Sequence, residues 1–257
     1  TTQMKTILSI AGSDPSGGAG IQADIRAITA CGGYPAAVPT ALTVQNTLGV
    51  SEVCCVDADL VRKQIAAVLQ DLQPAAIKIG MVGSCETVVV IAELLRKYLQ
   101  EHPSTAVVLD PVMAATSGKT LMDGSLWQSV EELLLPLVTL ITPNIPEARQ
   151  LLQDYHNDAT DAAAMLSMAG EISRKYGVAT LLKGGHLEGD TMTDVLFCNG
   201  KTKIYEQQKI ESRNLHGTGC MLSSAVATFL AKGYAIAEAV GAAKQFLTSA
   251  IKAAQSI

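Results

Sequence analysis

The chain has 257 residues, of which 48% are hydrophobic and 17% are charged, and its formal net charge at pH 7 is −5. This composition predicts a globular protein with a sizeable core and excludes a largely disordered chain. The acidic balance, without a dense Lys/Arg cluster, argues against nucleic acid or an anionic membrane as the main partner.

Membrane, zinc and disulfide signals are weak in this sequence. No apolar run reaches the roughly 18 residues that span a bilayer, and residues 1–13 lack the pattern of a secretory signal peptide. The six cysteines show no Cys-x-x-Cys spacing, and the four histidines do not cluster with them. We therefore predict a cytoplasmic protein without a structural zinc site or a disulfide framework.

The first predicted elements are a buried strand over residues 6–11, a glycine-rich loop and a helix over 21–28. The loop matches neither Gly-x-Gly-x-x-Gly nor the Walker pattern, so its glycines are interpreted as allowing close approach to a small ligand. Asp24 lies about one turn into the helix. Its carboxylate either faces that ligand or interacts with the helix dipole.

Strands and helices then alternate along the chain. Further strands are predicted over 34–44, 51–56, 75–79 and 106–109, and helices over 59–71 and 84–100. Gln45 follows the second strand, where its amide either binds a heterocycle edge or stabilises a turn. Asp110 follows a strand at the edge where doubly wound sheets bind ligands. Residues 114–124 are small and polar without periodicity, which predicts a mobile flap.

The second half of the chain continues the alternation. We predict a helix over 125–135, a strand over 138–141, a helix over 159–176, a strand over 179–182, a hairpin over 193–207 turning at Asn199-Gly200, and two Ala-rich helices. Asn144 and Glu147 lie three residues apart at a helix start. They either face one ligand or form a capping box. Lys183, beside two glycines at a strand end, is placed to reach a phosphate.

A short stretch before the last two helices carries the strongest chemical signal. Gly217, Thr218 and Gly219 precede a helix, and such a backbone can direct its N–H groups at an anion. Cys220 follows in the first turn, where the helix field is expected to lower the thiol pKa. This layout is typical of a group-transfer enzyme. The alternative is a glycine-rich loop with a buried cysteine packed as a small hydrophobe.

The order of elements predicts an α/β fold with a mainly parallel sheet and helices on both faces. No linker or internal repeat interrupts it, so we expect a single domain over residues 1–257. The polar candidates mostly follow predicted strands. They are therefore expected to line one crevice at the carboxyl edge of the sheet.

Seven motifs together resemble the hydroxymethylpyrimidine/phosphomethylpyrimidine kinases of thiamine biosynthesis, in the ribokinase superfamily. They are Ala11–Asp24, Thr43–Thr47, Lys78–Met81, Asp110–Met113, Thr142–Glu147, Lys183–His186 and His216–Cys220. The resemblance runs from the first strand to the last helix pair. It implies a ribokinase-like three-layer αβα sandwich with a small flap, and a homodimer.

The resemblance also implies the reaction. ATP, with Mg²⁺, would phosphorylate 4-amino-5-hydroxymethyl-2-methylpyrimidine and then its monophosphate. The pyrimidine pocket would comprise Gly12, Asp24, Gln45, Met81 and Val112. Gln45 is the residue that we expect to contact the aminopyrimidine edge, because an amide both donates and accepts.

Phosphate and metal contacts are implied in the same way. Asn144 and Glu147 match the superfamily's Asn-x-x-Glu motif, which holds Mg²⁺ largely through water, and Asp110 would support the metal. Lys183 would contact the transferring phosphate. Gly217, Thr218 and Gly219 would form the anion hole. The ATP contacts implied by the resemblance are Lys183, Asn144, Thr218 and Gly219.

Cys220 departs from the superfamily, in which an Asp usually deprotonates the attacking hydroxyl. An ordinary Cys has a pKa of about 8.5, so it serves as a base only as thiolate. Our hypothesis is that a neutral thiol tolerates a bound monophosphate that an Asp would repel.

Two other functions compete with this one. A pyridoxal kinase of the same subgroup would carry a second cysteine in the flap, and residues 112–115 contain none. A non-catalytic nucleotide- or vitamin-binding module would be expected to lose Lys183, the Asn-x-x-Glu pair or Cys220, and all are present.

Overall fold

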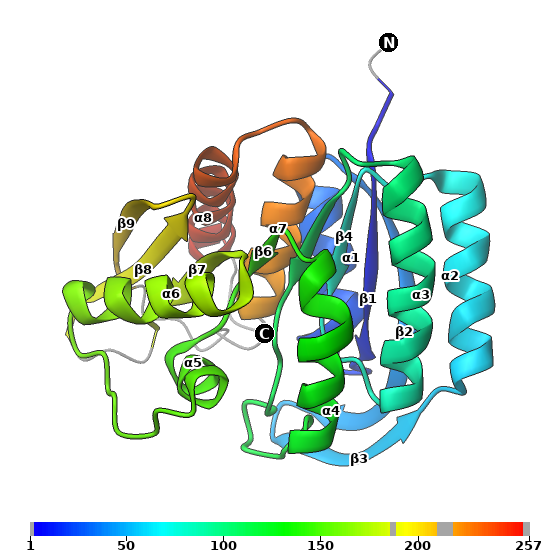
Figure 1. Ribbon diagram of the computed structural model, residues 1–257, viewed down its shortest axis with the longest axis horizontal. Coiled ribbons are helices and arrows are strands. Elements are labelled where there is room, and N and C mark those ends of the chain that lie inside the picture. Colours follow the sequence, from blue (N-terminus) through cyan, green and yellow to red (C-terminus); the bar gives the residue numbers. More distant parts are fainter. Residues whose placement is uncertain (1–2, 186–188, 210–217, 254–257) are drawn as a thin grey trace.

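A computed structural model describes residues 3–185, 189–209 and 218–253. In these residues one nine-stranded sheet has the order β3-β2-β1-β4-β5-β6-β7-β8-β9 (Figure 1). The strands are β1 Thr6–Ser13, β2 Tyr34–Asn46, β3 Gly49–Cys55, β4 Ala76–Ile79, β5 Ala106–Leu109, β6 Leu140–Ile141, β7 Ala179–Lys183, β8 Thr191–Cys198 and β9 Lys201–Gln208. Neighbouring strands are parallel along the run β2-β1-β4-β5-β6-β7 of this order. Strand β3 pairs with β2 in antiparallel fashion at one edge, and β8 and β9 add antiparallel pairs at the other.

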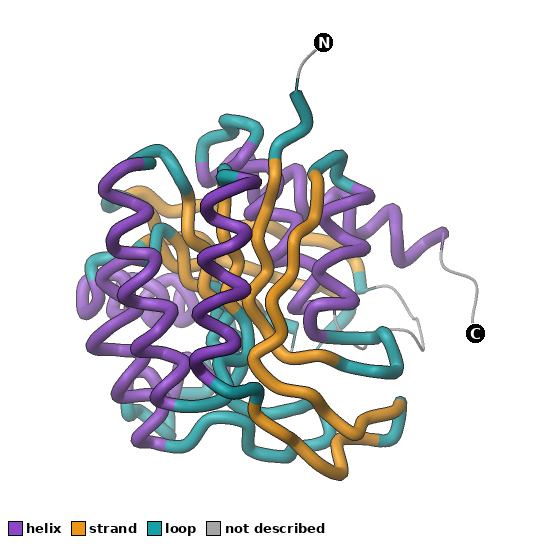
Figure 2. Tube along the Cα trace, turned by 90° about the vertical axis from the view of Figure 1, so that its right-hand side faces the viewer, coloured by secondary structure: helices purple, strands orange, loops and turns teal. Residues whose placement is uncertain are grey.

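Helices cover both faces of the sheet (Figure 2). They are α1 Gly20–Ala30, α2 Ala58–Leu72, α3 Cys85–Glu101, α4 Gly124–Ser129, α5 Ile145–Leu152, α6 Ala162–Tyr176, α7 Thr218–Ala231 and α8 Ile236–Ala253. One core cluster joins α2 to α6 to one face of the sheet, and a second joins α1, α7 and α8 to the other. The predicted α/β sandwich is confirmed.

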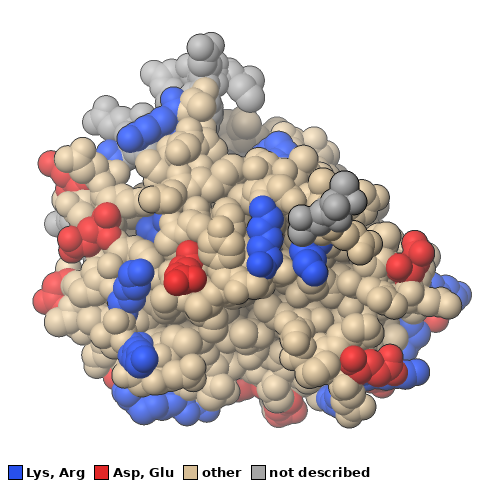
Figure 3. Space-filling model, turned by 90° about the horizontal axis from the view of Figure 1, so that it is seen from above, with Lys and Arg blue, Asp and Glu red and all other residues tan. Residues whose placement is uncertain are grey.

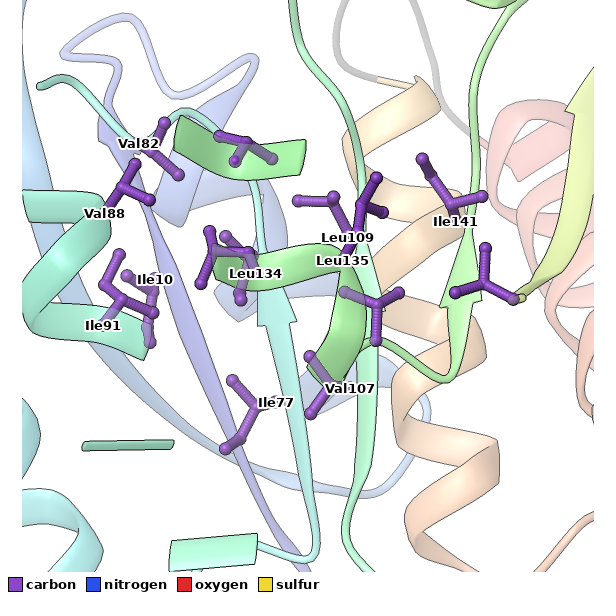
Figure 4. Close-up of a cluster of buried hydrophobic side chains, with 14 of the residues drawn as sticks. Ile10, Ile77, Val82, Val88, Ile91, Val107, Leu109, Leu134, Leu135 and Ile141 are labelled. Carbon is purple, nitrogen blue, oxygen red and sulfur yellow. The ribbon is translucent and has the colours of Figure 1, made fainter. Parts of the chain in front are cut away.

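The central strands are buried on both faces, which explains their continuous apolar runs. Ile77 of β4 and Val107 of β5 pack with Ile91 of α3 and with Leu134, and all four are fully buried (Figure 4). Burying one such aliphatic side chain stabilises the fold by roughly 1.5–3 kcal/mol. The rigid sheet therefore provides a fixed base for the loops at its carboxyl edge.

That edge contains a topological switch. The chain passes from β1 to β2 on one side and later returns to place β4 on the other side of β1. The strands that follow β1 are thus placed first on one side of it and then on the other. This reversal opens a crevice beyond the strand ends, which is where doubly wound sheets bind ligands. A ligand is therefore expected to contact the loops that follow β1, β4, β5, β6 and β7.

Several predicted boundaries shift for local reasons. The helix expected over 125–135 ends at Ser129 and continues as a π turn, Val130–Leu134, and a 3₁₀ turn, Leu135–Leu137, which contains Pro136. The strand expected from 138 is accordingly confined to β6. Helix α6 begins at Ala162, because Asp161 caps it by accepting a hydrogen bond from the Ala164 N–H.

The predicted hairpin is confirmed. Strands β8 and β9 pair in an antiparallel register with Cys198 opposite Lys201. Asn199 and Gly200, between them, have φ values of 51° and 72°. Two consecutive positive φ values fit the Asn-Gly turns that match the twist of a hairpin.

The charged side chains form no single-sign field on the face shown in Figure 3, where acidic and basic groups are interspersed among uncharged ones. Among the described helices, none has the length and apolar character needed to cross a membrane.

Candidate active site

The loops at the switch enclose a cavity of about 330 Å³, a volume suited to a small organic ligand. Its lining includes, from the predicted set, Gly12, Gln45, Met81, Asp110, Val112, Asn144, Glu147, Lys183, Thr218, Gly219 and Cys220. Side chains separated by up to 208 positions therefore meet at one place, from Gly12 to Cys220. Gly217 lies outside the described residues.

Lys183 is the main cation at one end of this cavity. Its Nζ lies 3.3 Å from Asp110 Oδ1, and its backbone N–H donates to Pro143 O at 2.9 Å. A Cβ placed on Gly219 would lie 3.1 Å from the same Nζ, so a glycine at this position keeps the approach to the ammonium open. The start of α7 and the end of β7 thus adjoin at a place suited to an anion.

Of the two alternatives for Asn144 and Glu147, the capping box is confirmed, and the contact with a ligand stays a prediction. Asn144 caps α5 by accepting from the Glu147 N–H at 2.8 Å, while Glu147 accepts from the Asn144 N–H at 2.9 Å. This is a capping box. Both residues also line the cavity, because the first turn of α5 begins directly after β6. The capping box therefore also holds the Asn144 and Glu147 side chains at the cavity.

The carboxylates here fit a hard divalent cation. Burial raises the pKa of Glu147 to about 7, and the neighbouring charge of Asp110 adds to this, while Lys183 opposes it. A cation at this place would relieve the repulsion between the carboxylates. Among the described residues, no three His, Cys, Asp or Glu side chains gather as a complete metal site. Phosphate and water oxygens would therefore supply most of the coordination.

The opposite end of the cavity is less polar. Gly12 lies near the end of β1, Met81 follows β4, and the Met81 sulfur lies 2.9 Å from the place of a Cβ on Gly12. Gln45 lies within β2, not after it as predicted, because β2 continues to Asn46 with a register shift between Val44 and Gln45. The Gln45 Oε1 accepts from the Thr43 hydroxyl at 3.1 Å, which holds the amide at the cavity.

Asp24 occupies a different place from the one predicted. It is fully buried behind the cavity wall and is absent from the lining residues. Its oxygens accept from Lys78 Nζ at 2.9 and 3.0 Å and from the hydroxyls of Ser9 and Ser224. Neither a direct ligand contact nor a helix-dipole role describes it, because a buried cation takes up its charge.

Cys220 lines the cavity in the first turn of α7, as predicted. The expected lowering of its pKa is wrong. Burial raises the pKa of this thiol, and Asp110 and Asp24 add to the effect, while Lys78 and the Gly20 N–H oppose it. The desolvation of the anion outweighs the helix field, so the thiol is neutral at pH 7 before substrates bind.

Sequence reasoning missed Lys78 as a site residue, although it belongs to a quoted motif. A signal was available. Lys78 and Ser9 are polar residues inside strands whose neighbours are all apolar, and buried polar groups require partners. Asp14, also unassigned, lines the cavity and orders the loop by accepting from the N–H groups of Ser16 and Ala19.

A second, more apolar cavity of about 130 Å³ adjoins the first. Lys183, Gly185, Thr218 and Gly219 line both cavities. The second is completed by Leu222 of α7, by residues of β8 and β9, and by Leu247 and Ile251 of α8. The two cavities meet where Lys183 and the start of α7 adjoin.

The flap folds over the first cavity. Residues 114–120 are closed by a bridge between Ala114 and Thr120 and by a hydrogen bond of 2.8 Å from the Ala115 N–H to Lys119 O. Lys119 Nζ also donates to Ser51 O at 3.1 Å. Contact with β3 gives the loop a support outside its own backbone. Its predicted mobility stays a prediction.

Known proteins share this architecture. A phosphomethylpyrimidine kinase family match covers residues 14–257. A Rhizobium meliloti hydroxymethylpyrimidine/phosphomethylpyrimidine kinase is 47% identical over 97% of this chain and 91% of its own length. The structure of a Clostridium difficile phosphomethylpyrimidine kinase is 41% identical, with a TM-score of 0.82 over 96% of this chain and 99% of that one.

A Bacillus subtilis pyridoxal kinase, solved as an ADP complex, is also similar. It is 33% identical, with a TM-score of 0.85 over 99% of this chain and 94% of that one. The backbone thus fits both kinds of kinase, whereas sequence identity is higher to the pyrimidine kinases. The extent of the family match, together with these relatives, shows that the chain belongs to the phosphomethylpyrimidine kinase family.

Proposed function

We propose that this protein phosphorylates 4-amino-5-hydroxymethyl-2-methylpyrimidine and then its monophosphate, with ATP as donor. The observation that carries the proposal is one cavity with two unlike ends. Gln45 and Met81 line an end suited to a heterocycle, and Lys183 lies at an end suited to a phosphate. The relatives named as pyrimidine kinases support this choice of acceptor.

The pyrimidine is assigned to the end of the cavity lined by Gln45, Met81 and Val112. The Gln45 amide donates to and accepts from the aminopyrimidine edge, while the thioether and the valine contact the ring faces. The acceptor hydroxyl then points towards Cys220. Holding the two reactants in one cavity removes much of the entropic part of the barrier.

ATP is assigned to the second cavity, with its phosphates at the junction of the two. The apolar side chains of Leu222 and Leu247 suit a base, and Lys183, Thr218 and Gly219 face the γ-phosphate. Lys183 and the N–H groups at the start of α7 stabilise the charge that develops on the transferring group. Gly217 is included in this hole from the resemblance.

A Mg²⁺ ion is proposed to bind at Asp110 and Glu147, with Asn144 holding a coordinated water. When bound, the ion would neutralise phosphate charge. The chain's own part is to keep two carboxylates in a largely buried place beside Lys183. Binding of a cation favours the ionised form of Glu147.

Pyridoxal is the second candidate acceptor, favoured by the similarity to pyridoxal kinases. The segment Val112–Ala115, beside the cavity, contains no cysteine that would capture an aldehyde. We therefore expect pyridoxal to be the poorer acceptor.

Steady-state kinetics with three separate acceptors test the proposal. The pyrimidine alcohol and its monophosphate should each stimulate ADP formation in the presence of Mg²⁺, with a kcat/KM at least tenfold above that for pyridoxal. A higher kcat/KM for pyridoxal would select the second function. If none of the three acceptors stimulates ATP consumption, the binding-module interpretation is favoured.

A homodimer is also proposed, from the family resemblance. In support, strand β2 and its turn expose three large apolar side chains, with relative exposures of 53% for Leu42, 55% for Val44 and 89% for Leu48. Light scattering coupled to gel filtration should give twice the 26.9 kDa mass of the chain, and Val44→Glu should shift it towards the monomer. A monomeric wild-type mass contradicts the proposal.

A further inference from the structure

Beneath the cavity, Asp24 of α1 and Lys78 of β4 form a wholly buried ion pair, with 0% exposure of both side chains. Asp24 accepts four hydrogen bonds in all. Two come from Lys78 Nζ, one from Ser9 of β1 at 2.6 Å and one from Ser224 of α7 at 2.7 Å. Groups from four elements thus converge on a single carboxylate.

Stability alone is a poor explanation for this pair. Removing two charges from water costs several kcal/mol per ion, and well-packed hydrophobic replacements of buried pairs are often neutral or stabilising. The pair also differs from a closed core contact. Lys78 lines the cavity, and within the described part of the chain both hydrogen bonds of its ammonium group go to Asp24. The Lys78 side chain has no exposed surface, so its charge acts on the cavity from within the wall.

The same pair is tied to Cys220. Ser224, which donates to Asp24, follows Cys220 by one helical turn on α7. The first turn of α7 is therefore held in position relative to Lys78. Gly80 leaves the space open, since a Cβ there would lie 3.1 Å from Lys78 Nζ. Lys78 and Cys220 both line the cavity.

Four charged groups around Cys220 influence whether its thiol ionises. Asp24 faces it from α1, Asp110 from the loop after β5, Lys78 from β4, and Lys183 from β7. Burial and both carboxylates disfavour a thiolate, whereas Lys78 favours it. Lys183 also interacts with Cys220, but it is paired with Asp110 and assigned to the phosphates, so we assign Lys78 to the thiol.

We propose that Lys78, held by Asp24, is a positioning residue that supplies a fixed positive charge beside Cys220 and the acceptor oxygen. The role rests on the proposed function. The Cys220 thiol, neutral in the free protein, first loses its proton to solvent. The resulting thiolate takes the proton of the acceptor hydroxyl, and the oxygen forms a bond to the γ-phosphorus. The bond from that phosphorus to the bridging oxygen breaks, and its electron pair leaves with ADP. Lys78 stays protonated throughout and lowers the energy of both anions.

The test measures Cys220 reactivity without any substrate. Asp24→Asn/Lys78→Met removes both charges together, which avoids leaving one buried and unpaired. Iodoacetamide is added to the ligand-free protein at pH 8, and alkylation is followed by peptide mass spectrometry. Cys198, which lies in the hairpin outside the cavity lining, serves as the reference thiol in the same sample.

We expect Cys220 alkylation to slow severalfold relative to Cys198, because Lys78, which favours the thiolate, has a larger effect on Cys220 than Asp24, which opposes it. Turnover of both acceptors should fall by a similar factor, with the KM for ATP unchanged. Tyr98→Phe is the matched control, because it removes a buried hydrogen bond to Pro74 O far from the cavity. Ser224→Ala, which keeps both charges but releases one tie between α7 and Asp24, should slow Cys220 alkylation less than the double variant does.

An unchanged or faster rate for Cys220 in the folded double variant overturns the proposal. If that variant does not fold, Asp24→Asn/Lys78→Gln provides the same comparison with amides that retain hydrogen bonding. Failure of the proposed function gives a different result. The wild-type protein would then not turn over the pyrimidines, while the alkylation rates would still report the effect of Lys78.

Discussion

Two Lys–Asp pairs flank the cavity, and they are built differently. Lys78 and Asp24 are joined at 2.9 Å with 0% exposure, and two serines complete the partners of Asp24. Lys183 and Asp110 are 3.3 Å apart, and Lys183 is 14% exposed. Among the described residues, the other side-chain contact of Asp110 is a long one of 3.5 Å from Thr142. The first pair is saturated, whereas the second keeps capacity for phosphate and a cation. At the acceptor end, Lys78 and Asp24 are thus occupied with each other. At the donor end, Lys183 and Asp110 can still bind a phosphate and a cation.

The largest expected effect concerns stability at the saturated pair. Asp24→Ala should lower the free energy of unfolding by about 3–5 kcal/mol, because it leaves the buried Lys78 ammonium unpaired. Asp110→Ala should lower it by less than Asp24→Ala does, since Lys183 is 14% exposed and keeps Glu147 nearby. Urea denaturation of both variants measures the difference. Equal losses would remove the distinction between the two pairs.

Lys183, of the Lys183–Asp110 pair, should have the larger effect on kcat/KM. Lys183→Met should lower kcat/KM roughly 10³-fold for both acceptors, because it removes the cation that faces the transferring group. Lys175→Met is the matched control, since Lys175 contacts Glu131 of the π turn and the Leu151 carbonyl of α5, outside the cavity. A loss below tenfold in Lys183→Met would contradict the assignment.

Cys220 lies between the two pairs and should separate the two phosphorylation steps. Cys220→Ala should lower turnover roughly 10²-fold if the thiolate is the base. Cys220→Asp should retain more activity on the alcohol than on the monophosphate, because a carboxylate repels the second substrate's phosphate. Initial rates with each acceptor measure this selectivity. Equal retention of the two steps would refute the hypothesis.

The smallest effect is a pH dependence at the donor end. The pKa of Glu147 is raised to about 7 in the folded protein, mainly by burial. The folded state therefore binds more protons than the unfolded state between the ordinary Glu pKa, about 4.3, and about 7, so this group's stabilising contribution declines as pH rises through that window.

Glu147→Gln should remove this decline. We expect the variant to be more stable than the wild type at pH 8 by on the order of 1–3 kcal/mol, with a smaller difference at pH 4. The amide oxygen can still accept from the Asn144 N–H, so the cap of α5 is kept. Thermal unfolding without Mg²⁺ or ATP measures both differences. A gain that is the same at the two pH values would contradict the raised pKa.

The alternation of apolar runs and helical periods was sufficient to predict the α/β class, the hairpin and most elements. Local chemistry explains this success, since β4 and β5 are buried on both faces and Asn199-Gly200 permits only a tight turn. Boundaries were less certain where tertiary contacts extend an element. Strand β2 runs on to Asn46 because β3 pairs with its end, and no local signal announces that pairing.

The sequence predicted which residues belong to the candidate site better than it predicted what they contact. Motifs identified Lys183, Asp110 and Glu147, and the structure brings them to one cavity. Asp24 was assigned to the ligand because a sequence does not show which surface a helical carboxylate meets. Lys78 went unassigned for the related reason that its partner lies 54 positions away.

By itself, the sequence determined the fold class, the family and the set of residues at the carboxyl edge, because each follows from local periodicity or from ordered motifs. Only the tertiary structure decided the charge state of those residues. Burial raises the pKa of Cys220 against the field of its helix, and Asp24 is neutralised by Lys78 behind the cavity wall. Desolvation and pairing depend on distances between elements, and those distances exist only once the sheet is assembled.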